Sequence, residues 1–238
     1  VVIPTFAFVF NLKVFAIFCN YPSAIASAVA SPCVAAGLPA IFSVLVIFAS
    51  PSLAKHHLSP SSQFVQSLAD QAVTALTADG ITTDMRRKQF RDVMRQNFAI
   101  DSIARFALGR YWRRASESQR LEYLKLFEDL IVMTWADQFS TYEGEKLKVE
   151  ESIDAASNQS RVKIVIVRSI WSIDKQTRIH VDWRVASQGK IYKVTDVMIE
   201  GISIARTKRD EFSSVIRRNN NEISALLKTL REKKLNNR

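Results

Sequence analysis

Apolar residues follow two different periods along the chain, and the change falls near Gly144. From residue 61 to 142 they recur every three or four positions, as on one face of an amphipathic helix. After Gly144 they alternate with polar residues, as in strands with one buried face. From Thr207, a candidate N-cap, the helical period returns. This order of elements predicts a single α+β domain.

The part before Gly144 is predicted to be helical throughout. A first helix covers residues 61–78, and a second starts near Asp84 and carries arginines largely off its apolar face. We expect that charged face to be solvated. A third, short helix ends at Gly109.

A long fourth helix is expected to start near Glu117, because Ser116 and Gln119 fit a capping box. It is expected to end only at Gly144. Its apolar stripe is unusually aromatic and consists of Leu121, Leu124, Phe127, Ile131, Trp135, Phe139 and Tyr142.

Four strands follow, and we expect them to form an antiparallel sheet. They lie around residues 147–149, 161–170, 178–186 and 190–199. In the third strand Ile179, Val181, Trp183 and Val185 share one face, and Arg178, His180, Asp182 and Arg184 share the other. The alternation predicts a sheet with one solvated face and one face packed on helices.

Residues 1–54 form a separate region, in which Lys13 is the one charged side chain. The apolar run 34–49 precedes small residues at Ser52 and Ala54, which predicts a signal peptide cleaved after Ala54. Because no Lys or Arg immediately precedes the run and the chain begins with Val, we expect the true start upstream. The alternative is a membrane hairpin of residues 1–19 and 34–50, but a span needs about 20 apolar residues. The expected division is therefore a leader, 1–54, and one domain, 55–238.

Charge and cysteine content argue against a nucleic-acid partner and against a disulfide or cysteine zinc site in the domain. Residues 55–238 contain 32 Lys and Arg against 23 Asp and Glu, a formal net charge of +9. These basic residues are dispersed and no nucleic-acid-binding motif is present, so a nucleic acid is not the expected partner. Both cysteines, Cys19 and Cys33, lie in the leader, which excludes a disulfide or a cysteine zinc site downstream.

The sequence contains little that predicts catalysis, a metal or a cofactor. There is no glycine-rich phosphate loop, nucleophile elbow, paired-histidine zinc helix or calcium loop. His56 and His57 lack a third ligand nearby, and we expect no metal there. His180 alternates with Asp182 on a strand, which allows a catalytic pair but more simply fits an exposed polar face. An enzyme is not expected, and an isomerase or hydrolase remains a minor alternative.

Several stretches of the domain resemble the MlaC, or toluene-tolerance auxiliary, family. The first runs from Asp101 to Trp112 and continues through Gln119 and Arg120 into the long helix, with Trp135, Tyr142 and Gly144 further on. The others are VDWRV at 181–185, YKVTDV at 192–197, EGISI at 200–204 and the start of the last helix at 207–212. Tyr192 and Thr195 depart from the tryptophan and the aromatic residue usual in the family. In order and spacing the matches cover about residues 62–232.

The resemblance implies a helical layer wrapped on a twisted four-stranded sheet, with acyl chains bound in an apolar cavity between them. It implies a periplasmic phospholipid carrier that serves an inner-membrane ABC transporter with an MCE-domain subunit and an outer-membrane lipoprotein complex. A hopanoid or another lipid is an alternative cargo. The residues expected to line the cavity are Phe106, Leu108, Tyr111, Leu124, Phe127, Ile131, Trp135, Phe139, Val165, Val167, Val181, Trp183, Val185, Val197 and Ile199.

Two features have competing explanations. A periodic apolar stripe is usually ordinary protein core, so each lining residue has that alternative. Four arginines are candidates to steer the domain to anionic membranes or to contact the lipid phosphate, and otherwise they form a solvated surface. They are Arg105, Arg110, Arg113 and Arg114.

Overall fold

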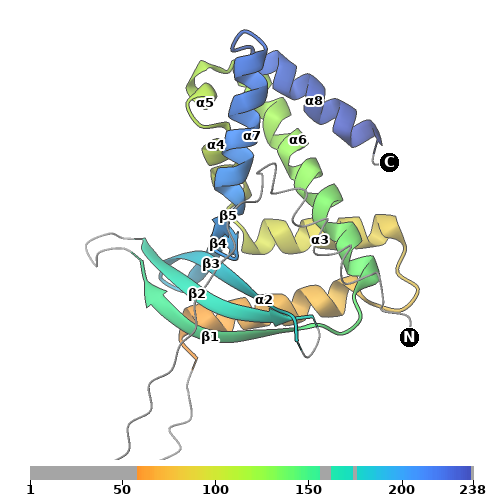
Figure 1. Ribbon diagram of the computed structural model, residues 1–238, viewed down its shortest axis with the longest axis vertical. Helices are drawn as coiled ribbons and strands as arrows, with labels where there is room; N and C mark the ends of the chain where they lie inside the picture. The colour runs from red at the N-terminus through yellow and green to blue at the C-terminus, as the bar shows by residue number, and fades with distance from the viewer. Residues whose placement is uncertain (1–57, 156–161, 174–175, 237–238) are drawn as a thin grey trace, which may run out of the picture. The chain divides into compact units, whose positions relative to one another are not determined.

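An antiparallel sheet and a group of helices that extends away from it make up this computed structural model, which describes residues 58–155, 162–173 and 176–236 (Figure 1). Before the sheet come α2 (Pro60–Leu76), α3 (Thr83–Asn97), α4 (Ile100–Leu108), α5 (Tyr111–Arg114), α6 (Glu117–Trp135) and the 3-10 helix η1 (Ala136–Thr141). The strands are β1 (Lys146–Asp154), β2 (Lys163–Ser172), β3 (Arg178–Gln188), β4 (Ile191–Ile199) and β5 (Ile202–Ser203). The chain continues with α7 (Ile204–Arg218) and α8 (Ile223–Asn236). The expected α+β class is confirmed. Outside the described residues lie the leader with its predicted cleavage site, the alternative hairpin, both cysteines, His56 and His57.

The sheet is an antiparallel meander in the order β1-β2-β3-β4-β5. Its four long strands correspond to the four predicted ones. The two-residue strand β5 was not predicted, because it is too short to show any alternation. It pairs with the end of β4 just before α7 begins.

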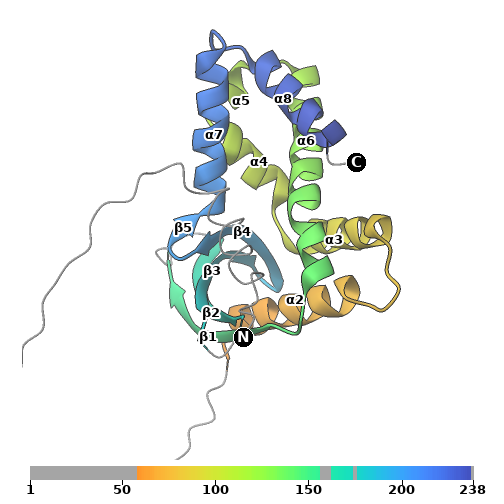
Figure 2. The same ribbon diagram turned by 45° about the vertical axis from the view of Figure 1, so that its right-hand side comes forward.

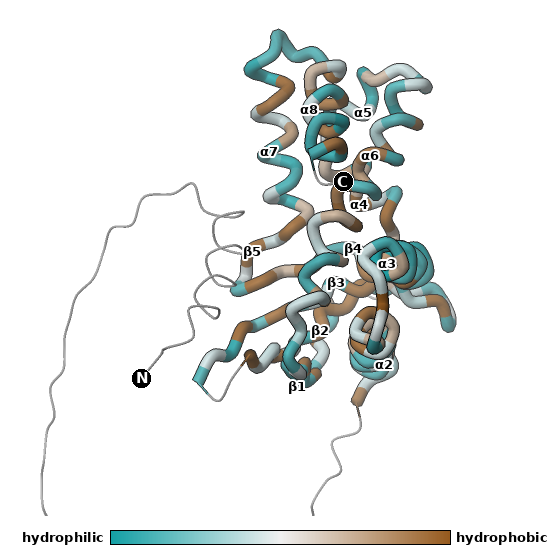
Figure 3. Tube along the Cα trace, turned by 90° about the vertical axis from the view of Figure 1, so that its right-hand side faces the viewer, coloured by the Kyte–Doolittle hydropathy of each residue, from teal (hydrophilic) through white to brown (hydrophobic). Residues whose placement is uncertain are grey.

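The helical layer is held together by a continuous apolar core. Helices α4, α6, α7 and α8 pack around the rings of Tyr123, Phe127 and Phe212. The ring centroids lie 5.9 Å apart for Tyr123 and Phe127, 6.1 Å for Tyr123 and Phe212, and 6.2 Å for Phe127 and Phe212. Figure 2 shows α4, α6, α7 and α8 side by side, with α2 lying across the sheet instead. In Figure 3 hydrophilic and hydrophobic residues alternate along α7 and α8, as expected of helices with one buried side.

Two predicted helix boundaries were wrong. Helix α6 ends at Trp135, and the chain continues to Thr141 as a 3-10 helix, since apolar spacing of three and four fits both geometries. Helix α7 starts at Ile204 with Ser203, not Thr207, as its N-cap. The carboxylate of Asp196 on β4 accepts hydrogen bonds from the Ser203 hydroxyl at 2.5 Å and from the amide of Ala205 at 3.1 Å. That cap depends on a neighbouring strand, which local sequence does not reveal.

Candidate functional site

One face of the sheet, called the inner face here, carries all the strand residues expected to line a cavity. Val165 pairs with Val185, and Val167 with Trp183, across β2 and β3. Trp183 also pairs with Val197, and Val181 with Ile199, across β3 and β4. Directly opposed residues project from the same side of a sheet. The seven side chains therefore form one apolar surface: Val165, Val167, Val181, Trp183, Val185, Val197 and Ile199.

Helix α2 covers part of the inner face. Val65 is fully buried with Val149, Val167 and Val185, and the rings of Phe64 and Tyr192 stack at 5.6 Å. We call these four valines, with the partly buried side chains packed on them, the sheet–α2 cluster. Its partly buried members are Leu58, Phe64, Leu147, Val165, Trp183 and Tyr192. Val197 and Ile199 are partly buried and lie outside it, so the inner face is only partly covered.

Polar contacts attach α2 to strand β1. The amide side chain of Gln66 donates to the carbonyl of Leu147 at 3.5 Å and accepts from the amide of Val149 at 3.4 Å. At the start of the helix, the hydroxyl of Ser152 donates to that of Ser59 at 2.8 Å. The two Gln66 bonds are long and therefore weak. The Ser59–Ser152 bond is therefore the stronger of the polar ties between α2 and β1.

A buried serine fixes the aromatic side chain at the centre of the inner face. The indole of Trp183 donates to the hydroxyl of Ser169 at 3.0 Å, and that hydroxyl donates to the carbonyl of Val181 at 2.7 Å. Ser169 is 1% exposed. Because an unpaired buried polar group is costly, this chain of bonds fixes the indole in one orientation.

The helical residues expected to line the cavity lie in a different cluster. Leu108, Tyr111, Phe127 and Ile131 are buried in the core of the helical layer, and Leu124, Trp135 and Phe139 pack against it. We call this the helical cluster. Phe106 is 43% exposed, with the guanidinium of Arg209 over its ring at 5.1 Å. The structure thus brings the strand residues together but places them apart from the helical ones.

The sequence predicts α2 as an amphipathic helix but does not predict that it covers the sheet. Phe64 and Val65 lie within the predicted helix 61–78, and Tyr192 stands out in the sequence only as a departure from the family. The pattern shows that α2 has a buried side, but it does not show which surface that side contacts.

An open depression of about 690 Å³ runs along α2. Its lining residues come from α2, the residue Leu58 before it and α3, and they present a mainly apolar surface: Leu58, Gln63, Gln66, Ser67, Asp70, Gln71, Thr74, Ala75 and Val93. None of the expected lining residues belongs to it. Acyl chains require a continuous apolar wall, and the aligned side chains of β2, β3 and β4 provide one, so the inner face is the candidate site.

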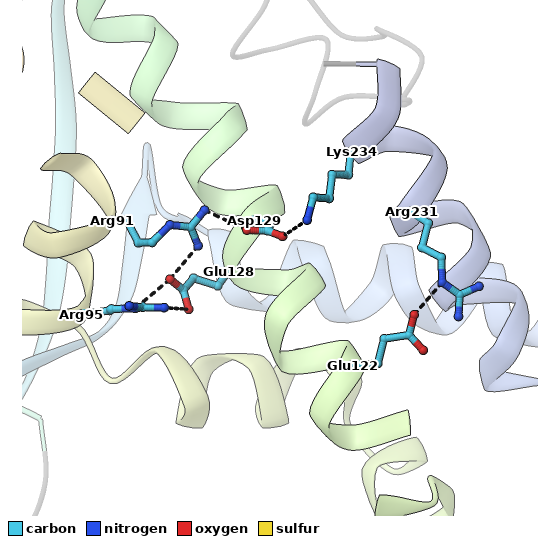
Figure 4. A network of polar contacts seen from close by, with 7 residues as sticks. All are labelled: Arg91, Arg95, Glu122, Glu128, Asp129, Arg231 and Lys234. Carbon is cyan, nitrogen blue, oxygen red and sulfur yellow. Dashed lines mark hydrogen bonds and ion pairs between the residues drawn. The ribbon is translucent and has the colours of Figure 1, made fainter. Parts of the chain in front are cut away.

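Ion pairs connect α6 to the helices on either side of it (Figure 4). Arg91 on α3 contacts Glu128 and Asp129 at 2.8 Å each, and Lys234 on α8 contacts Asp129 at 2.7 Å. The charged face of α3 was expected to be solvated, and that prediction was wrong, because acidic residues of α6 lie opposite it. Burial alone would raise the pKa of Asp129, but hydrogen bonds from Lys234 and Arg91 outweigh it and the pKa is lowered.

His180 and Asp182, the pair that the sequence allowed as catalytic, both lie on strand β3. The side chains of His180 and Asp182 share the outer face of the sheet, and no hydrogen bond or ion pair within the described ranges joins them. His180 instead accepts a bond at its carbonyl from the amide of Glu200 and donates one from its amide to the Glu200 carboxylate.

Within residues 58–155, 162–173 and 176–236, no three His, Cys, Asp or Glu residues gather as a metal site, and no helix is long and apolar enough to cross a membrane.

Comparisons with known proteins agree with this architecture. The family model described as MlaC protein matches residues 66–232. A relative from Haemophilus influenzae, the intermembrane phospholipid transport system binding protein MlaC, is 22% identical over 147 residues, which are 59% of this chain and 67% of the relative. A solved structure of a phospholipid-binding protein from Ralstonia solanacearum, in complex with a phospholipid, superposes with a TM-score of 0.65 at 18% identity, covering 75% of this chain and 99% of that one. Because the family model spans well over half of the sequence, this chain belongs to the MlaC family.

Proposed function

We propose that this protein is a carrier that binds a phospholipid with its acyl chains along the inner face of the sheet and moves it between membranes. The observation that carries the proposal is the incomplete cover of that face. Trp183, Val197 and Ile199 form part of an apolar surface and remain partly exposed, although the helical layer beside it has a closed core. The structural relative from Ralstonia is a complex with a phospholipid, which supports the same use of the fold.

The energetics explain why such a face must be covered by the carrier. Two long acyl chains have roughly 30 methylenes, and at about 0.8 kcal/mol each their exposure to water costs on the order of 20 kcal/mol. A carrier therefore has to enclose nearly all of them. Tails lying between α2 and the sheet would contact apolar side chains on both sides, with Phe64 and Val65 above and the valines of β2 and β3 below.

The proposed carrier works between two membranes. The protein would work in the periplasm, receive or deliver lipid at an inner-membrane ABC transporter with an MCE-domain subunit, and exchange it with an outer-membrane lipoprotein complex. The Haemophilus relative, which is named for intermembrane phospholipid transport, supports this setting. The expected signal peptide in residues 1–54 agrees with export.

The test is to block the inner face and measure lipid retention. Val165→Trp places a large ring on the inner face, whereas Ile166→Trp places the same ring on the outer face of the same strand; both positions are partly buried. Native mass spectrometry of gently purified protein should find phospholipid on wild type and on Ile166→Trp, and little or none on Val165→Trp. Loading from phospholipid vesicles should follow the same order. A wild-type protein that neither retains nor acquires phospholipid would overturn the proposal, as would equal loading of the two variants.

A further inference from the structure

Six arginines gather on the helical layer around α5, and together we call them the arginine surface. Arg105 lies on α4, three of the others on and beside α5, one on α6 and one on α7. The set is Arg105, Arg110, Arg113, Arg114, Arg120 and Arg209. Helix α5 lies at the end of the helical layer away from the sheet (Figures 1 and 2). The arginine surface is therefore separate from the inner face.

Aromatic rings hold most of these guanidinium groups in place. Trp112 has the guanidiniums of Arg105 and Arg120 over its ring, at 5.1 and 5.4 Å. Tyr111 likewise has those of Arg110 and Arg114, at 5.0 and 5.8 Å. A guanidinium that already rests on a ring loses less side-chain freedom when it binds a ligand. The arrangement is thus partly organised for binding before any ligand arrives.

Arg209 extends the surface from α7 to the end of α4. Its guanidinium covers the ring of Phe106, and a Cβ atom at Gly109 would lie only 3.0 Å from its Nε atom. Gly109 has φ +60°, so glycine is favoured there by its backbone as well as by this close approach.

None of the six guanidiniums forms an ion pair with a carboxylate within the described ranges. Residues 102–116 contain four arginines and no Asp or Glu. By contrast, Arg87 and Arg91 on α3 are each paired with acidic residues of α6 or η1. Asp101 and Glu117 flank this stretch but form no ion pair with the six within the described ranges, and Arg120 donates hydrogen bonds to the carbonyls of Trp112 and Arg113. No ion pair within these ranges therefore neutralises the group.

We infer that the arginine surface docks the protein on an anionic membrane through the phosphates of its acidic lipids. Guanidiniums bind phosphate oxygens in a planar, bidentate manner, and groups spread over four helices suit many head groups better than one short acidic segment. The exposed ring of Phe106 and the partly buried Trp112 beside them are of the kind that lies at a membrane interface. Membrane docking is separate from the proposed binding of phospholipid, because docking uses the arginine surface and lipid loading uses the inner face.

Cosedimentation with vesicles tests the inference. Wild type should bind vesicles of phosphatidylcholine mixed with phosphatidylglycerol, should not bind phosphatidylcholine alone, and should be released by high salt. The variant Arg105→Gln, Arg113→Gln, Arg114→Gln should bind roughly 100-fold more weakly, at about fivefold for each charge removed. Arg113→Gln alone, which removes no ring contact, should account for about one such step and guards against misfolding of the triple variant.

A matched control removes three charges elsewhere. Lys146→Gln, Lys148→Gln, Lys190→Gln replaces exposed lysines on and beside the strands and should leave vesicle binding nearly unchanged. Equal weakening by the control would overturn the inference, because net charge alone would then explain binding. Wild type that binds soluble polyglutamate but not the anionic vesicles would also overturn it, in favour of an acidic protein partner.

Lipid loading, measured on the same variants by native mass spectrometry, separates the two proposals. Loading should stay at the wild-type level in both triple variants, because neither alters the inner face. Loss of vesicle binding with normal loading supports the docking surface. Failure of wild type to load, with intact vesicle binding, would count against the carrier alone.

Discussion

The helical cluster and the sheet–α2 cluster are built from the same kinds of side chain, yet they differ in how completely those side chains are covered. Within the described residues the helical cluster contains 21 buried residues, and the sheet–α2 cluster contains four valines. The partly buried residues around the four valines outnumber them. Most of the apolar stabilisation of the domain therefore comes from the helices.

Helix α2 belongs to both clusters. Val65 in its first half is buried against the sheet, whereas Leu76 at its end is buried in the helical cluster. Further ties hold the helical side: Lys234 of α8 pairs with Asp129 of α6, and Glu211 of α7 accepts bonds from Lys208 and from Lys233 of α8. The helical layer, closed and cross-linked by ion pairs, thus supplies most of the stability, and the inner face is left available for a ligand.

The strongest test compares one large side chain from each cluster. Phe127 is 1% exposed in the helical cluster, so Phe127→Ala should lower the free energy of unfolding by about 3–5 kcal/mol. Trp183→Ala on the partly covered inner face should cost less, about 1–3 kcal/mol. Urea denaturation of lipid-free protein measures both. Phospholipid retention should show the opposite order, with Trp183→Ala impaired and the folded fraction of Phe127→Ala loaded normally.

Either of two results would show that the two clusters do not differ in this way. If Phe127→Ala is mildly destabilising and loses its lipid, Phe127 lines a cavity, as the sequence suggested, and the helical cluster is not closed. If Trp183→Ala keeps its lipid, the inner face is ordinary core.

The ion pairs at Asp129 provide a smaller, pH-dependent test. Asp129→Asn should lower the free energy of unfolding at neutral pH by about 1–2 kcal/mol, a value discounted because Arg91 and Lys234 are partly exposed. The pKa of Asp129 is lowered in the fold, so its contribution is complete above the ordinary aspartate value of 3.8 and is lost as the pH falls through the lowered value. The difference between wild type and variant should therefore be constant near neutrality and shrink below pH 3.8.

Asp92→Asn is the matched control, since Asp92 is exposed on α3 and has no ion pair within the described ranges. It should change stability little. A gap between wild type and Asp129→Asn that does not depend on pH would show that the amide disturbs packing and that the ion pairs contribute nothing measurable.

Local patterns predicted the elements of this fold well. The Ser116 and Gln119 capping box is present at the start of α6, and alternation in β3 placed Val181, Trp183 and Val185 on one face. These features depend on residues close together in the chain, where helix and strand periods apply directly.

Properties that depend on which elements meet were not predictable in the same way. Periodicity showed that Phe127 and Val65 are buried, but not that Phe127 packs against Phe212 and Val65 against the sheet. For the same reason the acidic partners of Arg91 could not be foreseen, since Glu128 and Asp129 lie 37 and 38 residues further along the chain. The list of lining residues therefore combined two clusters that the fold keeps apart.

A modest effect is expected at Ser169, whose hydroxyl accepts the hydrogen bond of the Trp183 indole on the inner face. Ser169→Ala removes the acceptor of the Trp183 indole and should cost about 1 kcal/mol, because the N–H and the Val181 carbonyl lose their shared partner. Ser172→Ala, on the outer face of the same strand, is the control and should be close to neutral. Since Trp183 is then free to reorient, phospholipid should exchange faster from Ser169→Ala than from the control, as measured by transfer of a fluorescent phospholipid to vesicles. Unchanged exchange together with the loss of stability would mean that the serine only stabilises the sheet and that indole orientation does not control the lipid.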